Sequence, residues 1–138
     1  MLPNGFNPMR WKCDINGCFN IKRRPKIEVF ADCFPRKINF GDVDGLVELN
    51  GWFCLLEWKG DGGELRQGQR RSYIEFTNEA RPGNIVLVVK GNPETMVVEN
   101  YSYFWAGNHF PTITADINAL KKRIRWWVDW TEQSRRAA

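Results

Sequence analysis

Two acidic residues and a lysine stand where a tight turn would bring them together. Asn50-Gly51 is the strongest short hairpin signal, because a type I′ turn needs positive φ at both central positions. Asp44 lies six residues before Asn50, and Glu57 lies six residues after Gly51. A two-residue hairpin therefore sets the two carboxylates opposite each other, with Cβ atoms about 5 Å apart. Lys59 shares the face of Glu57, because side chains alternate along a strand.

This arrangement of charges is suited to holding a cation against a phosphate. Two carboxylates so close repel each other unless a cation lies between them, and a hard divalent ion, Mg²⁺ or Mn²⁺, fits oxygen ligands best. Asp42 shares the strand face of Asp44 and is a further candidate ligand. Lys59 can orient an attacking water or stabilise charge on a phosphate, which predicts metal-dependent phosphodiester hydrolysis. The structural alternative, an ion pair of Lys59 with Asp44 or Glu48, leaves the second carboxylate unexplained.

Hydrophobic periodicity predicts the elements that position these residues. A helix is expected over 22–34, ended by Pro35, and a second over 64–78. Strands are expected around 43–49 and over 52–59, 85–90 and 95–104, the second of them central in a sheet. A loop is expected over 107–111, before a last helix capped by Thr114 or Asp116. Helices separated by strands predict a single α/β domain with a central mixed sheet flanked by helices, after an irregular segment over 1–20.

The order of these motifs resembles one nuclease family. Asp44, twelve intervening residues and Glu57-Trp58-Lys59 resemble the D…(D/E)XK signature of the PD-(D/E)XK nuclease superfamily, although no proline directly precedes Asp44. The resemblance covers roughly residues 22–90 and implies a restriction-endonuclease-like α-β-β-β-α-β core. In such a core an acidic residue on the first helix often joins the metal site, and Glu28 is the residue that matches.

The helix after Lys59 carries a second point of resemblance. Gln69-Arg70-Arg71-Ser72-Tyr73 resembles the QxxxY motif of the branch related to bacterial helicase-nucleases, with Gln67 as the competing glutamine. Gln69 and Tyr73 are four residues apart and share a helix face, so both can reach toward the site. The segment Leu55-Leu56-Glu57-Trp58-Lys59-Gly60 also resembles small nucleases encoded by phages.

The resemblance implies a Mg²⁺-dependent deoxyribonuclease. Asp44 and Glu57 would hold the metal, Lys59 would position water or phosphate, and Glu28 and Gln69 would assist. One alternative is a non-catalytic nucleic-acid-binding or adaptor module on the same fold. Another is an interaction protein that works through its tryptophan-rich last helix, where the run from Trp126 to Trp130 is expected to pack or to form a homodimer face.

The charge distribution is compatible with DNA as the partner. The 138 residues carry 20 Lys and Arg against 16 Asp and Glu, a mild basic bias. Basic residues gather in three clusters that could follow a phosphate backbone or be solvated helix faces. The clusters are Lys22, Arg23, Arg24 and Lys26; Arg66, Arg70 and Arg71; and Lys121, Lys122, Arg123 and Arg125. Within them, the residues predicted to bind nucleic acid are Arg23, Arg24, Arg66, Arg70 and Arg71.

Cysteine use and hydropathy bear on the compartment. No stretch approaches the roughly 18 apolar residues of a membrane span and no signal peptide opens the chain, so we expect a cytoplasmic protein, in the host cytoplasm if it is phage-encoded, with reduced cysteines. Cys13, Cys18 and Cys33 lack an evident fourth ligand, so a structural zinc is not expected. His109 is a conceivable general base that the predicted metal chemistry does not need.

Overall fold

The computed structural model describes residues 27–38, 40–41, 43–60 and 63–134, and it divides the chain into two compact units, 1–41 and 42–138. In the first unit, the 3-10 helix η1 (Ile27–Cys33) falls within the predicted helix. The ring of Phe40 makes edge-to-face contacts with Phe30 and Phe34. The predicted irregular segment over 1–20 lies outside the described residues.

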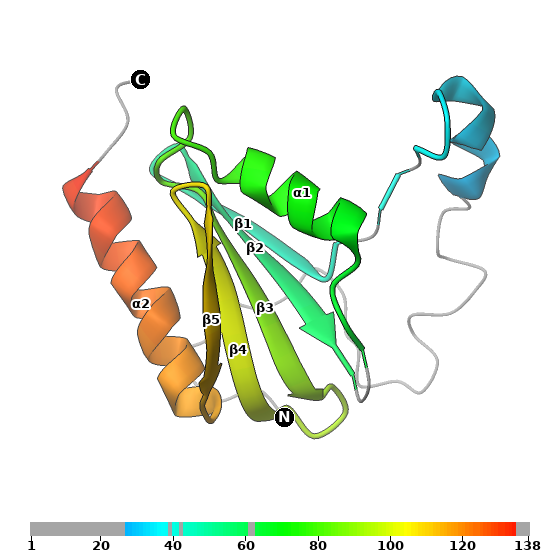
Figure 1. The fold of residues 1–138 in the computed structure, drawn as a ribbon. Helices are drawn as coiled ribbons and strands as arrows, with labels where there is room; N and C mark the ends of the chain where they lie inside the picture. The colour runs from blue at the N-terminus through cyan, green and yellow to red at the C-terminus, as the bar shows by residue number, and fades with distance from the viewer. Residues whose placement is uncertain (1–26, 39, 42, 61–62, 135–138) are drawn as a thin grey trace. The chain divides into compact units, whose positions relative to one another are not determined.

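The second unit is an α/β domain built on a five-stranded mixed sheet (Figure 1). Strand order follows chain order from β1 to β5, with β2 and β3 parallel and the other neighbours antiparallel. Helix α1 makes the crossover between the two parallel strands, and α2 follows the last strand. The elements are β1 (Gly45–Leu49), β2 (Trp52–Lys59), α1 (Gln67–Phe76), β3 (Ile85–Asn92), β4 (Val97–Trp105), β5 (Asn108–Thr114) and α2 (Ile117–Gln133). The predicted mixed sheet with flanking helices is confirmed.

The hairpin between β1 and β2 has the predicted turn and register. Asn50 and Gly51 have φ of 54° and 88°, as a type I′ turn requires. Leu49 pairs with Trp52, and the register runs unbroken to the pair of Gly45 with Leu56. Asp44 therefore stands one residue before β1, where the same register would place it opposite Glu57.

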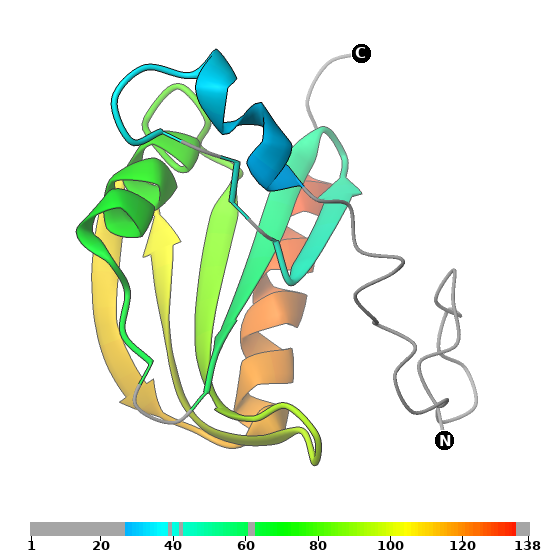
Figure 2. The ribbon, with the colours of Figure 1, turned by 90° about the vertical axis from the view of Figure 1, so that its right-hand side faces the viewer.

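Helices α1 and α2 cover opposite faces of the sheet (Figure 2). Alternate residues of β3 point to opposite sides, so Leu87 packs with Leu120 and Trp127 of α2, whereas Val86 and Val88 pack with Tyr73 of α1. Trp127 is fully buried and its Nε1–H donates to the carbonyl of Gly83 at 2.8 Å. The tryptophan run is thus largely engaged in packing, with Trp126 left 39% exposed.

The predicted loop over 107–111 is wrong, because β5 occupies most of it. Ala106 and Gly107 have φ of 53° and 77°, and this turn sends the chain back along β4. Pro111 is tolerated because β5 is an edge strand, where a missing N–H leaves no partner strand unsatisfied. The register of β4 and β5 also shifts between Tyr101 and Tyr103. The Gly and Pro residues that suggested a loop are here parts of a hairpin.

Helix α1 begins later than predicted, and helix α2 begins after one of its two predicted caps. Helix α1 begins at Gln67 and not at Glu64. Helix α2 is capped by Asp116, whose side chain accepts from the N–H of Ala119 at 2.9 Å, which decides between the two predicted caps. No helix among the described residues is long and apolar enough to cross a membrane.

Candidate active site

Glu57 and Lys59 lie side by side on the α1 face of β2. Lys59 Nζ is 3.2 Å from Glu57 Oε1, and the two side chains are only 15% and 11% exposed. The neighbouring Leu55 and Val88 on this face belong to the apolar cluster under α1. A carboxylate in such surroundings is costly unless charge and hydrogen bonds compensate it. The groups that contact Glu57 therefore show how the fold compensates the charge of this carboxylate.

Gln69 links both charged groups to the start of α1. Its Oε1 accepts from Lys59 Nζ at 3.0 Å and from the backbone N–H of Arg66 at 3.1 Å. Its Nε2 donates to Glu57 Oε1 at 3.4 Å. The N–H of Arg66 precedes the helix, where backbone donors need side-chain acceptors. One amide therefore both caps α1 and holds the acid and the lysine, whereas Gln67 is exposed.

Tyr73 completes the cluster from one helical turn further along. Its ring is 8% exposed and packs edge-to-face on Phe104 at 5.4 Å. Its hydroxyl is hydrogen-bonded to Glu57. Burial is the main reason that the Tyr73 pKa is raised well above its ordinary value, and the negative charges of Glu57 and Asp44 raise it further. The phenol therefore stays protonated and serves as a donor to the carboxylate.

Asp44 is held against the backbone beside Glu57. Its Oδ2 accepts from the N–H of Trp58 at 2.6 Å, a group on the edge of β2 that lies beyond the end of β1. The Asp44 side chain is exposed, and its charge acts on Tyr73 together with that of Glu57. The predicted acid pair and the lysine therefore gather at one end of the hairpin. We call Asp44, Glu57, Lys59, Gln69 and Tyr73 the Glu57 cluster.

The donor set of the Glu57 cluster fits a hard divalent cation in part. It offers two carboxylates, and Mg²⁺ in proteins is commonly held by one or two carboxylates, with water and substrate phosphate completing its shell. Among the residues described here, no group of three or more His, Cys, Asp or Glu side chains gathers in one place. Asp42 and the side chain of Glu28, the other predicted acids, fall outside the description.

Of the five arginines predicted to bind nucleic acid, three lie on or just before α1 and two lie outside the described residues. Arg66, Arg70 and Arg71 are exposed on or just before α1, next to the Glu57 cluster. Arg23 and Arg24 are not described. The third basic cluster lies on α2, which covers the opposite face of the sheet. It is therefore not part of the surface around Glu57.

A second polar group on the α1 face was not predicted from the sequence. His109 of β5 contacts Ser102 of β4 through Nε2 at 3.0 Å and Arg70 of α1 through Nδ1 at 2.5 Å. Its ring is stacked on Phe104, with centroids 4.0 Å apart and planes 3° from parallel. Burial, followed by the charge of Arg70, lowers the His109 pKa. Only the pairing of β4 with β5, which the predicted loop obscured, would have revealed this group.

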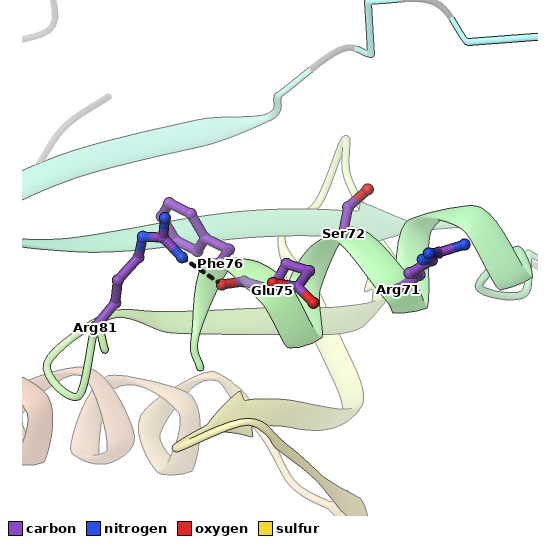
Figure 3. A pocket seen from close by; sticks show the side chains of 5 residues that line it. All are labelled: Arg71, Ser72, Glu75, Phe76 and Arg81. Atoms are coloured by element: carbon purple, nitrogen blue, oxygen red, sulfur yellow. Dashed lines mark hydrogen bonds between the residues drawn. The ribbon is translucent and has the colours of Figure 1, made fainter. Parts of the chain in front are cut away.

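A shallow pocket lies on the outer side of α1 (Figure 3). Its lining residues are Arg71, Ser72, Glu75, Phe76 and Arg81. The Arg81 guanidinium closes one end by donating from Nη1 to the carbonyl of Glu75 at 3.0 Å. None of these residues belongs to the Glu57 cluster, whose helix residues face the sheet. The pocket is therefore separate from the candidate active site.

The two described cysteines do not add to the site. Cys54 is buried on the α2 face of β2, and burial raises the pKa of its thiol to about 12. Cys33 is exposed in η1, and both thiols are free. Cys13 and Cys18 lie outside the described residues, so the predicted absence of a zinc site stays a prediction.

The chemistry open to the Glu57 cluster is that of a buried acid and a part-buried amine beside a second, exposed acid. Lys59 has three N–H donors, of which Glu57 and Gln69 engage two, so one can meet an incoming anion. Two carboxylates beside that amine would repel a phosphate unless a cation joined them. Comparison of the chain with protein-family models, with curated proteins and with solved structures gave no match.

Proposed function

We propose that this protein is a metal-dependent nuclease of the PD-(D/E)XK kind that hydrolyses phosphodiester bonds in DNA. The observation that carries the proposal is the bonding of Gln69 to both Lys59 and Glu57 at 3.0 and 3.4 Å. Further support comes from the segment β1–β2–α1–β3, whose hairpin, helix and parallel strand are compatible with part of the α-β-β-β-α-β core. Two described strands precede α1, one fewer than in that core.

Asp44 and Glu57 are the residues that would hold a Mg²⁺ or Mn²⁺ ion. When bound, the ion would neutralise phosphate charge and lower the pKa of a coordinated water. Asp44 is fixed from behind by the N–H of Trp58. Glu57 is fixed by Lys59, Gln69 and Tyr73. Such fixed side chains lower the reorganisation needed when charge develops on the phosphate.

Lys59 would contact the substrate directly. Its ammonium is held by Glu57 and Gln69, and its third N–H would donate to a phosphate oxygen or to the attacking water. Gln69 and Tyr73 would act as positioning residues, because their described contacts are with the acid and the amine. Tyr73 can do so over a wide pH range, since its raised pKa keeps the hydroxyl protonated.

A purely binding module accounts less well for the acids. Arg66, Arg70 and Arg71 supply the positive charge that attracts a phosphate backbone. Asp44 and Glu57 work against that attraction, and burying Glu57 costs stability as well. Both acids become favourable for substrate binding only when a cation is present, which favours metal-dependent cleavage over binding alone.

The test is cleavage of supercoiled, linear, single-stranded and branched DNA, and of RNA, with Mg²⁺, with Mn²⁺ and with EDTA. Wild type is compared with Glu57→Gln and Lys59→Met, which keep side-chain size. The matched controls are Glu99→Gln and Lys122→Met, which remove the same charges from exposed positions outside the Glu57 cluster. We expect each site variant to lose activity by about 10²-fold or more, and the controls to retain it.

Two results would decide against the proposal. Cleavage that survives both site substitutions would remove the Glu57 cluster from the reaction. Salt-dependent DNA binding by a folded wild-type protein that cleaves no substrate with either metal would instead support the non-catalytic module.

A further inference from the structure

The imidazole of His109 is fixed on three sides. Phe104 fixes the ring plane by parallel stacking at 4.0 Å. Ser102, which is 6% exposed, contacts Nε2, and Arg70 contacts Nδ1 from α1. Ser102 belongs to the same cross-strand row as Glu57, with Val88 between them. Two strand spacings place Ser102 roughly 10 Å from Glu57 on the same face of the sheet.

These contacts determine which ring nitrogen carries the proton. A guanidinium has only N–H donors, so Nδ1 must accept the hydrogen bond from Arg70. The neutral ring then carries its proton on Nε2, and this N–H donates to Ser102 Oγ. A protonated ring would turn an Nδ1–H donor toward the Arg70 donor and place two positive charges together. Protonation of His109 and its hydrogen bond from Arg70 therefore exclude each other.

We propose that neutral His109 is a positioning residue that holds the Arg70 guanidinium on the α1 face to bind a backbone phosphate a few nucleotides from the bond at Glu57. This inference rests on the proposed function, because that function supplies the phosphodiester. Arg70 donates one N–H to His109 and keeps four for a phosphate, enough for a two-pronged contact. Arg70 also directly follows Gln69, so its side chain, which we call the Arg70 arm, projects from the same helix as Gln69 and Tyr73 of the Glu57 cluster.

Arg70 is the neighbour of His109 whose contact depends on the protonation state of the imidazole ring. Helix α1 presents Arg70, and β4 presents Ser102 and Phe104, which do not titrate in this range. Among the described residues, Arg70 is the charged group that acts on the ring, and it lowers the His109 pKa after the larger effect of burial. Acidification through that pKa is expected to release Arg70. The chain contains a single histidine, so its resonances identify themselves.

The first test reads the ring directly and needs no nuclease activity. Long-range ¹H–¹⁵N spectra of the full-length protein, recorded across pH, report the tautomer and pKa of His109. We expect the Nε2–H tautomer, and we expect Arg70→Ala to move the pKa upward. Arg125→Ala, which removes an exposed arginine from α2 on the opposite face, should leave the pKa unchanged. An Nδ1–H tautomer, or no response to Arg70→Ala, would overturn the pairing.

The second test measures binding of a fluorescent DNA oligonucleotide with Ca²⁺ in place of Mg²⁺. At pH 8 we expect Arg70→Ala and His109→Ala to bind about three- to tenfold more weakly than wild type. Arg70→Ala loses the phosphate contact itself, whereas in His109→Ala the Arg70 side chain is no longer held and must be ordered on binding. His109→Gln should restore binding, since its amide can accept from Arg70 and donate to Ser102. Its affinity should also not show the additional loss on acidification that wild type shows.

The outcomes separate this inference from the proposed function. Tighter binding by wild type at low pH, lost in His109→Gln, would mean that protonated His109 itself contacts phosphate, and would overturn the inference. Equal binding by wild type and His109→Ala at pH 8 would also overturn it. If the ring behaves as expected and DNA binds with the expected variant effects, but no substrate is cleaved with Mg²⁺, the proposed nuclease activity fails and the Arg70 arm stands.

Discussion

Replacing Gln69 by leucine should destabilise the protein much more than the same change at Gln67. Gln69 makes three hydrogen bonds, to Lys59, to Glu57 and to the N–H of Arg66. Gln67 is exposed two residues earlier in α1. Glutamine and leucine have similar helix propensities. The comparison therefore isolates the contacts of the side chain.

The expected loss follows from the three bonds. A hydrogen bond to a charged group contributes about 1.5–3 kcal/mol when buried, and partial exposure of Lys59 reduces this to about 1–2 kcal/mol. The cap on Arg66 adds about 1 kcal/mol. The 3.4 Å contact with Glu57 adds little at that length. Gln69→Leu should lower the free energy of unfolding by about 2–3 kcal/mol, and Gln67→Leu should change it by less than about 0.5 kcal/mol.

Urea unfolding followed by tryptophan fluorescence measures this difference, since the chain has seven tryptophans. With a slope of about 1–3 kcal/mol/M, the midpoint of Gln69→Leu should fall by roughly 0.7–3 M. If Gln69→Leu unfolds within about 0.5 kcal/mol of wild type, or if Gln67→Leu is equally destabilised, then Gln69 does not link the acid and the lysine to α1. The role assigned to it would be wrong.

Two further predictions concern packing and pH. A Cβ on Gly91 would lie 2.1 Å from the carbonyl oxygen of Val97, so Gly91→Ala should lower the free energy of unfolding, measured by thermal unfolding, by at least about 2 kcal/mol. A Cβ on Gly68 would meet nothing within 4 Å, so Gly68→Ala should raise the free energy of unfolding by about 0.5–1 kcal/mol. The His109 pKa is lowered in the folded chain, so the unfolded chain binds more protons between that pKa and about 6.5. The free energy of unfolding should therefore fall as the pH drops through this window, and His109→Gln should abolish this contribution; a matching acid loss in His109→Gln would assign it to other groups.

The sequence predicted best where a local signal determined the structure. Asn50-Gly51 specified the turn, and the turn specified the register that brings Asp44 toward Glu57. The alternation of side chains along β2 put Glu57 and Lys59 on one face. The spacing of Gln69 and Tyr73 indicated a shared helix face, and α1 turns that face toward β2. These relations depend on residues close in the chain, so patterning alone could predict them.

The pattern of residues along the sequence could not predict contacts between segments that are far apart in the chain. Arg70 and His109 are 39 residues apart, and their contact requires β5 to pair with β4. Gly107 and Pro111 suggested a loop because both residues commonly interrupt strands. At the edge of the sheet Gly107 is compatible with the turn, and the N–H that Pro111 lacks is not needed by a partner strand. Tertiary pairing, which the sequence does not display, decided between the two.

Burial and bonding in the Glu57 cluster favour a functional role over a structural one. An ion pair kept for stability alone can usually be replaced by apolar side chains without loss, and the apolar neighbours Leu55 and Val88 on the same face would accommodate such a change. The chain instead retains a buried acid, which needs Lys59, Gln69 and Tyr73 to compensate it. The start of α1 depends on one of those same contacts. A fold that couples its crossover helix to a costly acid in this way keeps that acid oriented, which is what a catalytic carboxylate requires.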